Sequence, residues 1–308
     1  MSIVTLTMNP AIDKSTAVDR VVAEHKLRCD PPHFEPGGGG INVSRVIKRL
    51  GESALTLYPA GGPPAELLQR LLAEEGLQHR PIPINGWTRE NLAVYESSTQ
   101  QQFRFGMTGP KLEDKEWRRC LEQVENIAPP PDFLVASGSL PPGVPTDFYQ
   151  QLAGLCSGSG IHLVVDTSGD ALRLALKDGL FLIKPNLREL RSLIGEDIED
   201  ESGQEQAVRS LIEKKCCRYV VVSLGAAGVM AAGPDQFKRL RAPTVRIRSK
   251  VGAGDSTVAA IVLGLKQGKS FMDAVRYGMA AGAAAVMTPG SELCRRTDVE
   301  RLYREMKG

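Results

Sequence analysis

A carboxylate stands directly behind a glycine-rich turn in the segment 249–257, which has the sequence SKVGAGDST. Glycine has no side chain, so such a turn can bring backbone N–H groups close to a ligand. The apolar residues that follow recur at helical spacing, and the N-terminus of a helix attracts phosphate oxygens. Because Asp255 would repel phosphate, it is better suited to accept a proton from a hydroxyl group that attacks phosphorus. The alternative is that Asp255 only caps the helix.

A second glycine cluster, in the segment 36–42 with the sequence PGGGGIN, also runs into a helical pattern. Four consecutive glycines indicate that something approaches their backbone closely or that the loop bends sharply. Asn42, in the first predicted turn, offers an amide that can hydrogen-bond sugar hydroxyls or phosphate. A flexible linker is the alternative. The bounding proline and the well-patterned helix argue against it.

These two motifs occur with shorter ones in the order TLTMNPAID, HKLRC, FEPGGGGIN, WTREN, SGSLPPG, KPNLREL, VSLGAAG and VGAGDS. Together they resemble the phosphofructokinase B family of ribokinase-like sugar kinases, and within it the bacterial type-2 6-phosphofructokinases. The resemblance implies ATP-dependent phosphorylation of fructose 6-phosphate to fructose 1,6-bisphosphate. Relatives acting on fructose 1-phosphate or tagatose 6-phosphate usually carry lysine in the loop (GGKGIN), where this chain has Gly39. A 1-phosphofructokinase or a tagatose-6-phosphate kinase is therefore the alternative.

The expected fold is α/β and ribokinase-like, a single domain over residues 1–308 with a central, mostly parallel sheet flanked by helices. Short runs rich in valine, leucine and isoleucine are typical of parallel strands and occur at 133–136, 161–165, 180–183 and 219–222. Polar residues follow each run. Ligands bind outside the carboxyl ends of the strands in open α/β sheets, so we expect the active site at that edge.

A small β-sheet lid is expected from insertions at about 14–36 and 88–107. Residues 91–98 and 101–107 read as a hairpin, because apolar and other residues alternate in the second segment. A sheet with one apolar face must be covered. The family resemblance implies that the lid sheet pairs between two subunits, so we expect a homodimer.

The resemblance also assigns roles on the sugar side. Asp255 would be the catalytic base, and the turn before it would supply amides that hold the migrating phosphoryl group. A phosphorylated substrate also needs cations, and the planar fork of arginine binds two oxygens. The candidates are Gly252, Ala253 and Gly254 for the amides; Asp13, Gly38, Gly39 and Asn42 for the sugar; and Arg89, Lys26, Arg28 and Ser137 for the phosphate. Lys26 is further implied to touch a second, inhibitory nucleotide across the dimer.

The nucleotide is expected along the glycine-bearing turn 223–228 and a small-residue helix face at 280–285. The family resemblance implies that Mg²⁺ is placed largely through water by an N-x-x-E pair, which suits a cation that keeps several waters. It also makes potassium activation plausible through backbone oxygens. The candidates are Lys184, Asn186, Ser223, Gly225, Gly228, Met279 and Ala283 for ATP; Asn186 and Glu189 for Mg²⁺; and Ser249 and Val251 for K⁺. Glu189 could instead be a solvated helix carboxylate.

Composition favours a cytoplasmic enzyme. The net charge is +2, from 38 basic and 36 acidic residues, and aromatic residues make up 5%, so we expect no nucleic-acid partner. The six cysteines show neither CxxC nor zinc spacing. No signal peptide or apolar run of about 20 residues is visible, so we expect no membrane partner. The absence of a Walker A motif excludes a P-loop kinase. A non-catalytic sugar-phosphate sensor with this fold is a further alternative. An NAD-dependent oxidoreductase is disfavoured, because its G-x-G-x-x-G motif would need glycine where this chain has Thr257.

Overall fold

The computed structural model describes residues 2–195, 198, 200–290 and 292–306. In this part of the chain nine strands form one sheet, in the order β13-β12-β11-β10-β9-β8-β1-β4-β5. All pairs from β11 to β5 are parallel, while β12 is antiparallel to both of its neighbours. The strands are β1 Ile3–Leu6, β4 Leu55–Ala60, β5 Gln78–Pro83, β8 Phe133–Ser137, β9 His162–Asp166, β10 Leu180–Ile183, β11 Cys217–Ser223, β12 Val229–Gly233 and β13 Gln236–Leu240. The four predicted apolar runs coincide with β8 to β11, and the predicted α/β class is confirmed.

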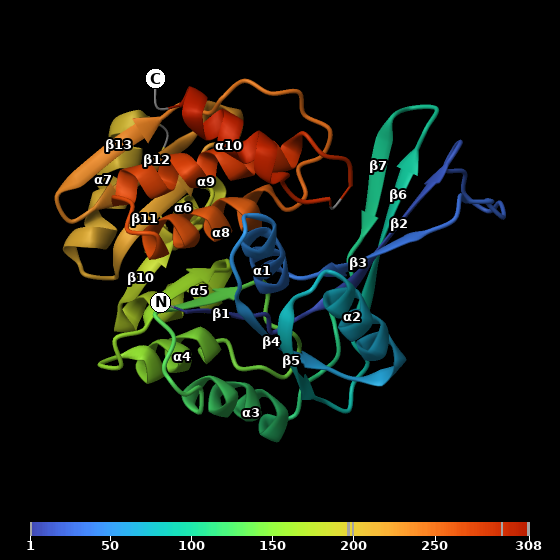
Figure 1. The fold of residues 1–308 in the computed structure, drawn as a ribbon, viewed down its shortest axis with the longest axis horizontal. Coiled ribbons are helices and arrows are strands. Elements are labelled where there is room, and N and C mark those ends of the chain that lie inside the picture. Colours follow the sequence, from blue (N-terminus) through green and yellow to red (C-terminus); the bar gives the residue numbers. More distant parts are fainter. Residues whose placement is uncertain (1, 196–197, 199, 291, 307–308) are drawn as a thin grey trace.

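Helices cover both faces of this sheet (Figure 1), because successive residues of a buried strand point to opposite sides. In β8, Phe133 and Val135 belong to one hydrophobic core, whereas Leu134 and Ala136 belong to the other. The first core contains residues of α1 Gly39–Arg49, α8 Ala253–Lys266, α9 Phe271–Val286 and α10 Arg296–Glu305. The second contains residues of α3 Asp114–Glu125, α4 Phe148–Cys156, α5 Gly169–Ala175, α6 Leu187–Ile194 and α7 Glu201–Glu213. No helix among the described residues is both long enough and apolar enough to cross a bilayer.

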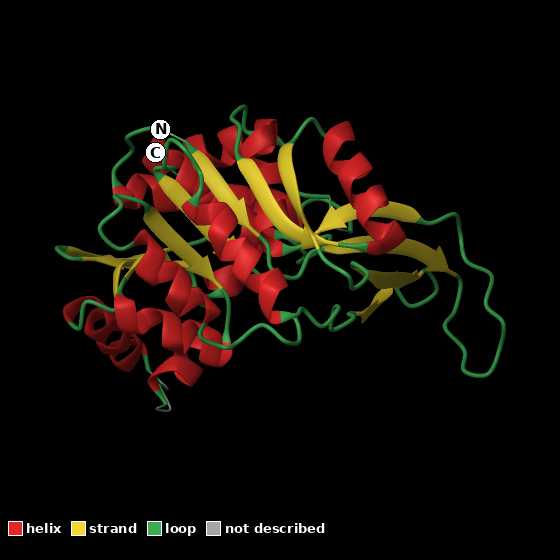
Figure 2. Ribbon diagram, turned by 90° about the horizontal axis from the view of Figure 1, so that it is seen from below, coloured by secondary structure: helices red, strands yellow, loops and turns green. Residues whose placement is uncertain are grey.

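A separate four-stranded sheet, which we call the lid sheet, projects beyond the main body (Figure 2). Its strands, in the order β3-β2-β6-β7, are β2 Ala11–Val18, β3 His33–Gly37, β6 Arg89–Glu96 and β7 Gln101–Phe105. The predicted hairpin is the antiparallel pair β6–β7. Only part of the predicted insertion 14–36 is strand, since residues 19–32 form a long loop between β2 and β3. Helix α2, Gly62–Glu74, packs in a third small core at the root of the lid sheet.

The two glycine motifs each begin a helix, and the two helices α1 and α8 pack against each other (Figure 1). Helix α1 starts after Gly38, whose φ is 117°, and α8 starts after Gly252, whose φ is 72°. Other residues rarely adopt these positive φ values, which explains the glycines. Two helix N-termini are therefore brought to the carboxyl edge of the sheet. Short 3₁₀ turns at Leu176–Asp178 and Gly225–Ala227 complete the described helical structure.

Candidate functional site

Asp255 lies in the first turn of α8 and does not cap it. The N-cap position belongs to Gly252, and no side chain caps this helix. The capping alternative is therefore wrong. The carboxylate is instead an acceptor for a side chain of the other glycine motif, since Asn42 Nδ2 donates to Asp255 Oδ2 at 2.9 Å.

The surroundings of Asp255 make its carboxyl group a weaker acid than usual. Burial is the main cause that raises its pKa, from 3.8 to about 6. The neighbouring carboxylates of Asp166 and Asp13 raise it further, while the Asn42 hydrogen bond and the Lys184 ammonium act in the opposite direction. A group with a pKa near 6 is mostly ionised at neutral pH and is basic enough to take a proton. These are the properties of a general base.

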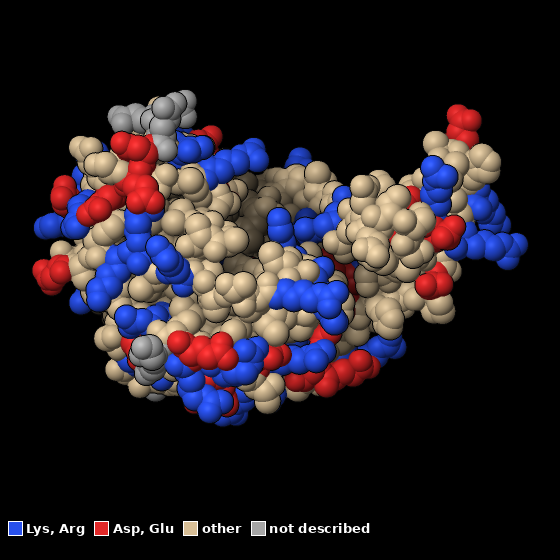
Figure 3. Space-filling model, turned by 90° about the horizontal axis from the view of Figure 1, so that it is seen from above, with Lys and Arg blue, Asp and Glu red and all other residues tan. Residues whose placement is uncertain are grey.

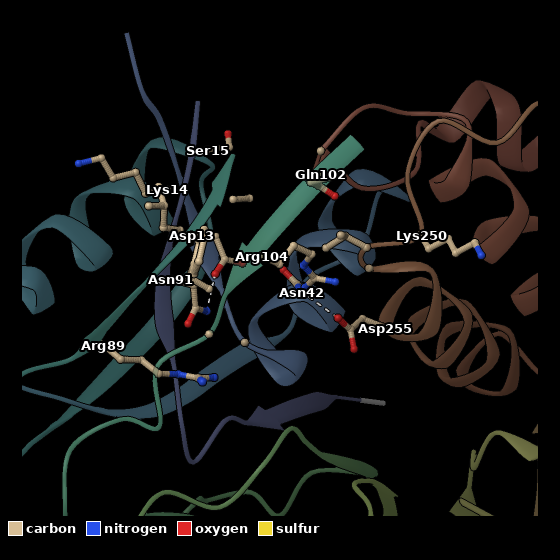
Figure 4. Close-up of a pocket in the computed structure, with 18 of the residues that line it drawn as sticks. Asp13, Lys14, Ser15, Asn42, Arg89, Asn91, Gln102, Arg104, Lys250 and Asp255 are labelled. Atoms are coloured by element: carbon tan, nitrogen blue, oxygen red, sulfur yellow. Dashed lines mark hydrogen bonds between the residues drawn. The ribbon is translucent and has the colours of Figure 1, made fainter. Parts of the chain in front are cut away.

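A first cavity of about 580 Å³ separates the lid sheet from the start of α8. Figure 4 shows Asp13, Asn91 and Arg89 on the lid side and Asn42 and Asp255 on the opposite side. The structure thus brings together most of the predicted sugar-side residues. The lining includes Asp13, Gly38, Gly39, Asn42, Arg89, Arg104, Gly252 and Asp255. Asn91 Nδ2 donates to Asp13 Oδ1 at 2.8 Å, which fixes the orientation of that carboxylate.

Ser137 does not have the placement that a phosphate ligand needs. It is only 1% exposed and lies beneath the glycine loop. A Cβ atom added to Gly39 would collide with Ser137 Oγ. The structure therefore explains the glycine at this position and puts the serine outside the first cavity. The nearby Ser139 lines a neighbouring cavity together with Arg89.

Arg89 is a partly buried cation that donates to backbone carbonyls. Its Nη1 atom donates to Met107 O at 2.7 Å and its Nη2 atom to Asn9 O at 2.9 Å. Burial lowers its pKa, and the charge of Asp13 opposes that effect. In the described part of the chain, no carboxylate forms an ion pair with Arg89. An anionic group entering the first cavity would supply the missing negative charge.

Lys26 and Arg28 are not brought into the cavities of their own chain. Both are exposed and lie in the loop 19–32, which extends beyond the end of β2 (Figure 1). Figure 3 shows basic side chains at the far end of the lid and around the hollow between the lid and the main body. The prediction that these two residues line the sugar side therefore fails within a single subunit.

A second cavity, of about 410 Å³, lies on the other side of residues 253–255. It is lined mainly by small and apolar residues, with one buried lysine at its polar end. The predicted nucleotide-side residues that share it are Lys184, Ser223, Gly225, Gly228, Met279 and Ala283, together with Ala253 and Gly254. A flat apolar ring and a charged tail would both find complementary surroundings here.

The side chains of Asn186 and Glu189 form a capping box at the N-terminus of α6. Asn186 Oδ1 accepts from Glu189 N at 2.9 Å, and Glu189 Oε2 accepts from Asn186 N at 2.8 Å. Neither residue lines the second cavity. Glu189 is thus not simply a solvated carboxylate, because it caps the N-terminus of α6. No cluster of three or more His, Cys, Asp or Glu side chains that could hold a metal ion occurs among the described residues.

Ser249 and Val251 lie in the turn that precedes α8. Ser249 Oγ donates to Gly290 O at 2.6 Å and accepts from Val251 N at 3.2 Å. These bonds connect the loop before α8 to the loop after α9. Residue 291, which directly follows Gly290, lies outside the described residues.

Three residues of the site were not singled out as site residues from the sequence. Asp166, at the end of β9, pairs with Lys184 Nζ at 3.4 Å and faces Asp255. Asn91 orients Asp13. Lys250 is the one described side chain that lines both the first and the second cavity. The sequence places Asp166 after a predicted strand, at the expected edge of the sheet, but gives it no role; Lys250 could have been found from its place inside the glycine motif.

The arrangement defines a class of protein. A weakly acidic carboxylate at a helix N-terminus lies between a polar cavity and an apolar one, as transfer of a phosphoryl group between a nucleotide and a polar acceptor requires. Residues 4–298 match the pfkB family of carbohydrate kinases, and the chain belongs to that family.

Individual relatives agree with this assignment. The chain is 45% identical over 301 residues to ATP-dependent 6-phosphofructokinase isozyme 2 of Mycobacterium tuberculosis, covering 98% of this chain and 88% of the relative. It is 40% identical over 302 residues to the isozyme of the same name from Escherichia coli, covering 98% and 97%. The crystal structure of Escherichia coli phosphofructokinase-2 with fructose-6-phosphate superposes with a TM-score of 0.94 at 39% identity, covering 100% and 99% of the two chains. Other structures of that enzyme are a complex with potassium and a tetrameric inhibited form.

Proposed function

We propose that this protein is an ATP-dependent 6-phosphofructokinase that converts fructose 6-phosphate to fructose 1,6-bisphosphate. The observation that carries the proposal is the placement of Asp255 between the first and the second cavity. The names of the two relatives, at 45% and 40% identity over nearly the whole chain, support the choice of substrate.

In the proposed reaction the 1-hydroxyl oxygen of the sugar attacks the γ-phosphorus of ATP. A new P–O bond forms to that oxygen, the bond between the γ-phosphorus and the β–γ bridging oxygen breaks, and ADP leaves. The hydroxyl proton passes to the Asp255 carboxylate. Amide N–H groups at the start of α8, from Ala253, Gly254 and Asp255, would stabilise the charge on the migrating group. The apolar second cavity would hold adenine beside Met279 and Ala283.

The 6-phosphate would bind at the lid side of the first cavity, next to Arg89. A desolvated guanidinium that pairs with no carboxylate in the described ranges gains most from a phosphate ligand, because charge-assisted bonds replace lost hydration. Arg104, which lines the same cavity, would add a second cation. Asp13 and Asn42 would bind the sugar hydroxyls.

The glycine loop supports this activity over the two alternatives. Lysine at position 39, as in the GGKGIN loops of kinases for fructose 1-phosphate or tagatose 6-phosphate, could not be accommodated here without moving Ser137. The loop of this chain is therefore built for a residue without a side chain.

Cations would assist in two places. When bound to ATP, Mg²⁺ would neutralise charge on the β- and γ-phosphate oxygens. Glu189 keeps one carboxylate oxygen outside the capping box, which fits contact with a hydrated ion through water. The potassium complex of the Escherichia coli enzyme supports a K⁺ site near Ser249 and Val251 in this chain. Equal activity in K⁺ and Na⁺ buffers would contradict that site.

We further propose a homodimer formed through the outer face of the lid sheet. On this face Phe34, Lys14, Leu92 and Phe105 form one cross-strand row, and Phe34 and Phe105 are 37% and 48% exposed. A second copy of the same sheet would cover this row. Lys26 and Arg28 would then be available to the partner's site, including any inhibitory nucleotide there.

The free cysteines favour the cytoplasm as the location of the protein.

The test of the proposed function is ADP release from MgATP with four sugars: fructose 6-phosphate, fructose 1-phosphate, tagatose 6-phosphate and fructose. We expect the highest kcat/KM with fructose 6-phosphate. A preference for another phosphorylated sugar would support the alternative activities. Turnover with none of them would favour the sensor. Inhibition at high MgATP in the same assay would support the regulatory nucleotide, and normal saturation would count against it.

A further inference from the structure

Arg45 is a fully buried cation that neither the sequence motifs nor the proposed function uses. It lies on α1, three residues after Asn42, and its side chain is 1% exposed. Burying a charge is costly unless the charge is paired and hydrogen-bonded. The contacts that this guanidinium makes therefore indicate why it is there.

The guanidinium of Arg45 joins three parts of the molecule. Its Nε donates to Glu75 Oε1 and Oε2, at 2.9 and 3.0 Å, at the C-terminal end of α2. Its Nη1 donates to Pro36 O at 3.0 Å, and its Nη2 to Glu35 Oε1 at 3.3 Å, both on lid strand β3. Nη1 also donates to Asn42 Oδ1 at 3.3 Å.

The last of these bonds connects Arg45 to the catalytic base. The Asn42 amide lies between Arg45 and Asp255, accepting from the first and donating to the second at 2.9 Å. Arginine can only donate hydrogen bonds and an ionised carboxylate can only accept them. The amide can therefore satisfy both neighbours in one orientation, with its oxygen toward Arg45 and its NH₂ group toward Asp255.

We propose that Arg45 is a positioning residue, which fixes the orientation of the Asn42 amide and through it the hydrogen bond to Asp255. It touches neither cavity, since it lines neither the first nor the second. Because Glu35 and Pro36 belong to the same lid sheet as Asp13, Arg45 also ties the root of the lid to the carboxylate that takes the proton.

The pH dependence of turnover should report this connection. The groups that face Asp255 are Asp166 of β9, Asp13 of β2, Lys184 after β10 and Asn42 of α1. Of these, the Asn42 hydrogen bond and Lys184 are the two that lower the Asp255 pKa. Once the amide is free to turn, its oxygen can face the carboxylate and the bond is lost. The Asp255 pKa would then rise, and turnover would begin to fall at a higher pH as the solution is acidified.

A purely structural ion cluster is the competing explanation, and it makes a different prediction. Buried ion pairs often add little net stability over apolar replacements, and a structural role does not require contact with Asn42. If Arg45 only holds α1, α2 and β3 together, removing it should lower stability and activity whether or not Asn42 is present.

The experiment is a double-mutant cycle with Arg45→Met, Asn42→Ala and the double variant, measuring kcat as a function of pH. We expect Arg45→Met to lower kcat roughly tenfold, the usual effect of losing a hydrogen bond to a charged group, and to move the acidic limb upward. In the Asn42→Ala background the same change should have almost no further effect on kcat. Equal fold-losses in both backgrounds would overturn the proposal.

Two further variants keep the test decisive if Arg45→Met folds poorly. Arg45→Lys retains the charge for Glu75, but its single ammonium cannot serve all four acceptors, so the upward shift of the acidic limb should remain. Glu75→Gln is the matched control, because it weakens the ion cluster on the side away from Asn42. It should lower the unfolding free energy and leave the pH profile in place; a shifted limb in this control, or an unshifted one in Arg45→Lys, would contradict the proposal.

The inference rests on the proposed function in taking Asp255 as the base. The two can fail separately. Full turnover after Asp255→Asn would remove the proposed mechanism, whereas additive effects of Arg45 and Asn42 would remove only the positioning role.

Discussion

The environment of Asp255, the proposed catalytic base, implies that its ionised carboxylate lowers the stability of the folded protein. Burial and two neighbouring carboxylates raise its pKa from 3.8 to about 6, so the ionised form is disfavoured in the folded protein. The difference corresponds to about 3 kcal/mol at neutral pH, since one pKa unit is about 1.36 kcal/mol. Asp255→Asn removes the charge and keeps an oxygen that can accept from Asn42. We therefore expect this variant to be more stable than the parent at pH 7, by at most about 3 kcal/mol.

The sign of the pH dependence follows from the raised pKa. Above pH 6 the folded parent carries the buried charge and its full cost. As the pH falls through 6 the carboxyl group becomes protonated, and the cost disappears near 3.8, where the unfolded chain is protonated as well. The advantage of Asp255→Asn should therefore shrink to less than about 1 kcal/mol at pH 4.

The assay is denaturant unfolding of both proteins at pH 7 and pH 4, at one fixed protein concentration because association affects apparent stability. Asp170→Asn is a suitable control, since Asp170 is an exposed carboxylate on α5 that pairs only with Arg173 among the described residues. It should change stability little at either pH. A destabilised Asp255→Asn at pH 7, or an advantage that persists undiminished at pH 4, would refute the reasoning about the buried charge.

Three other predictions concern the cations and the lid. Arg89→Lys should raise KM for fructose 6-phosphate roughly 10- to 100-fold with a smaller effect on kcat, because lysine lacks the planar guanidinium proposed to bind the phosphate; an unchanged KM would exclude Arg89 as the phosphate ligand. Lys250→Met should lower kcat/KM for MgATP roughly tenfold and Lys250→Arg should restore most of it, because this side chain lines both cavities; equal activity of all three proteins would show that it contacts no phosphate. Phe105→Glu should give monomers in sedimentation velocity, since Phe105 is 48% exposed on the outer face of the lid sheet; an unchanged dimer would place the interface elsewhere.

The fold could be predicted from the sequence to a large extent, because its signals are local. The runs at 133–136 and 219–222 consist of apolar residues that suit strands buried on both faces, and they are β8 and β11. The glycine motifs predicted the N-termini of two helices, and the structure has helices beginning at Gly39 and Ala253. The hairpin was predicted from the alternation of apolar and other residues over 101–107, and it is the pair β6–β7.

The electrostatics of the site could not be predicted in the same way, because they depend on groups distant in the sequence. The raised pKa of Asp255 comes from its depth and from Asp166 and Asp13, which the sheet topology brings to it. No local pattern shows that Gly252, and not Asp255, occupies the N-cap position. The capping box of Asn186 and Glu189, by contrast, could have been predicted from their three-residue spacing, but the two residues were interpreted as a Mg²⁺ site instead.

Three predicted substrate residues do not line the first cavity, because a motif does not show where its side chains point. Ser137 is the last residue of β8, one residue beyond the predicted run, and the glycine loop covers it. Lys26 and Arg28 were expected to bind the substrate phosphate from the lid, but they lie in the exposed loop beyond β2. In the proposed homodimer they would be available to the partner's site, and a local motif does not report how subunits assemble.

The most direct test of the account is a single-turnover experiment on Asp255→Asn with saturating MgATP and fructose 6-phosphate. Mixing and quenching isolate the chemical step from product release, and calorimetry on the same samples gives the sugar Kd. If Asp255 is the base, phosphoryl transfer should slow by about 10²- to 10⁴-fold while the Kd stays nearly unchanged. Transfer at the rate of the parent protein would show that the proton goes elsewhere and would contradict the central claim.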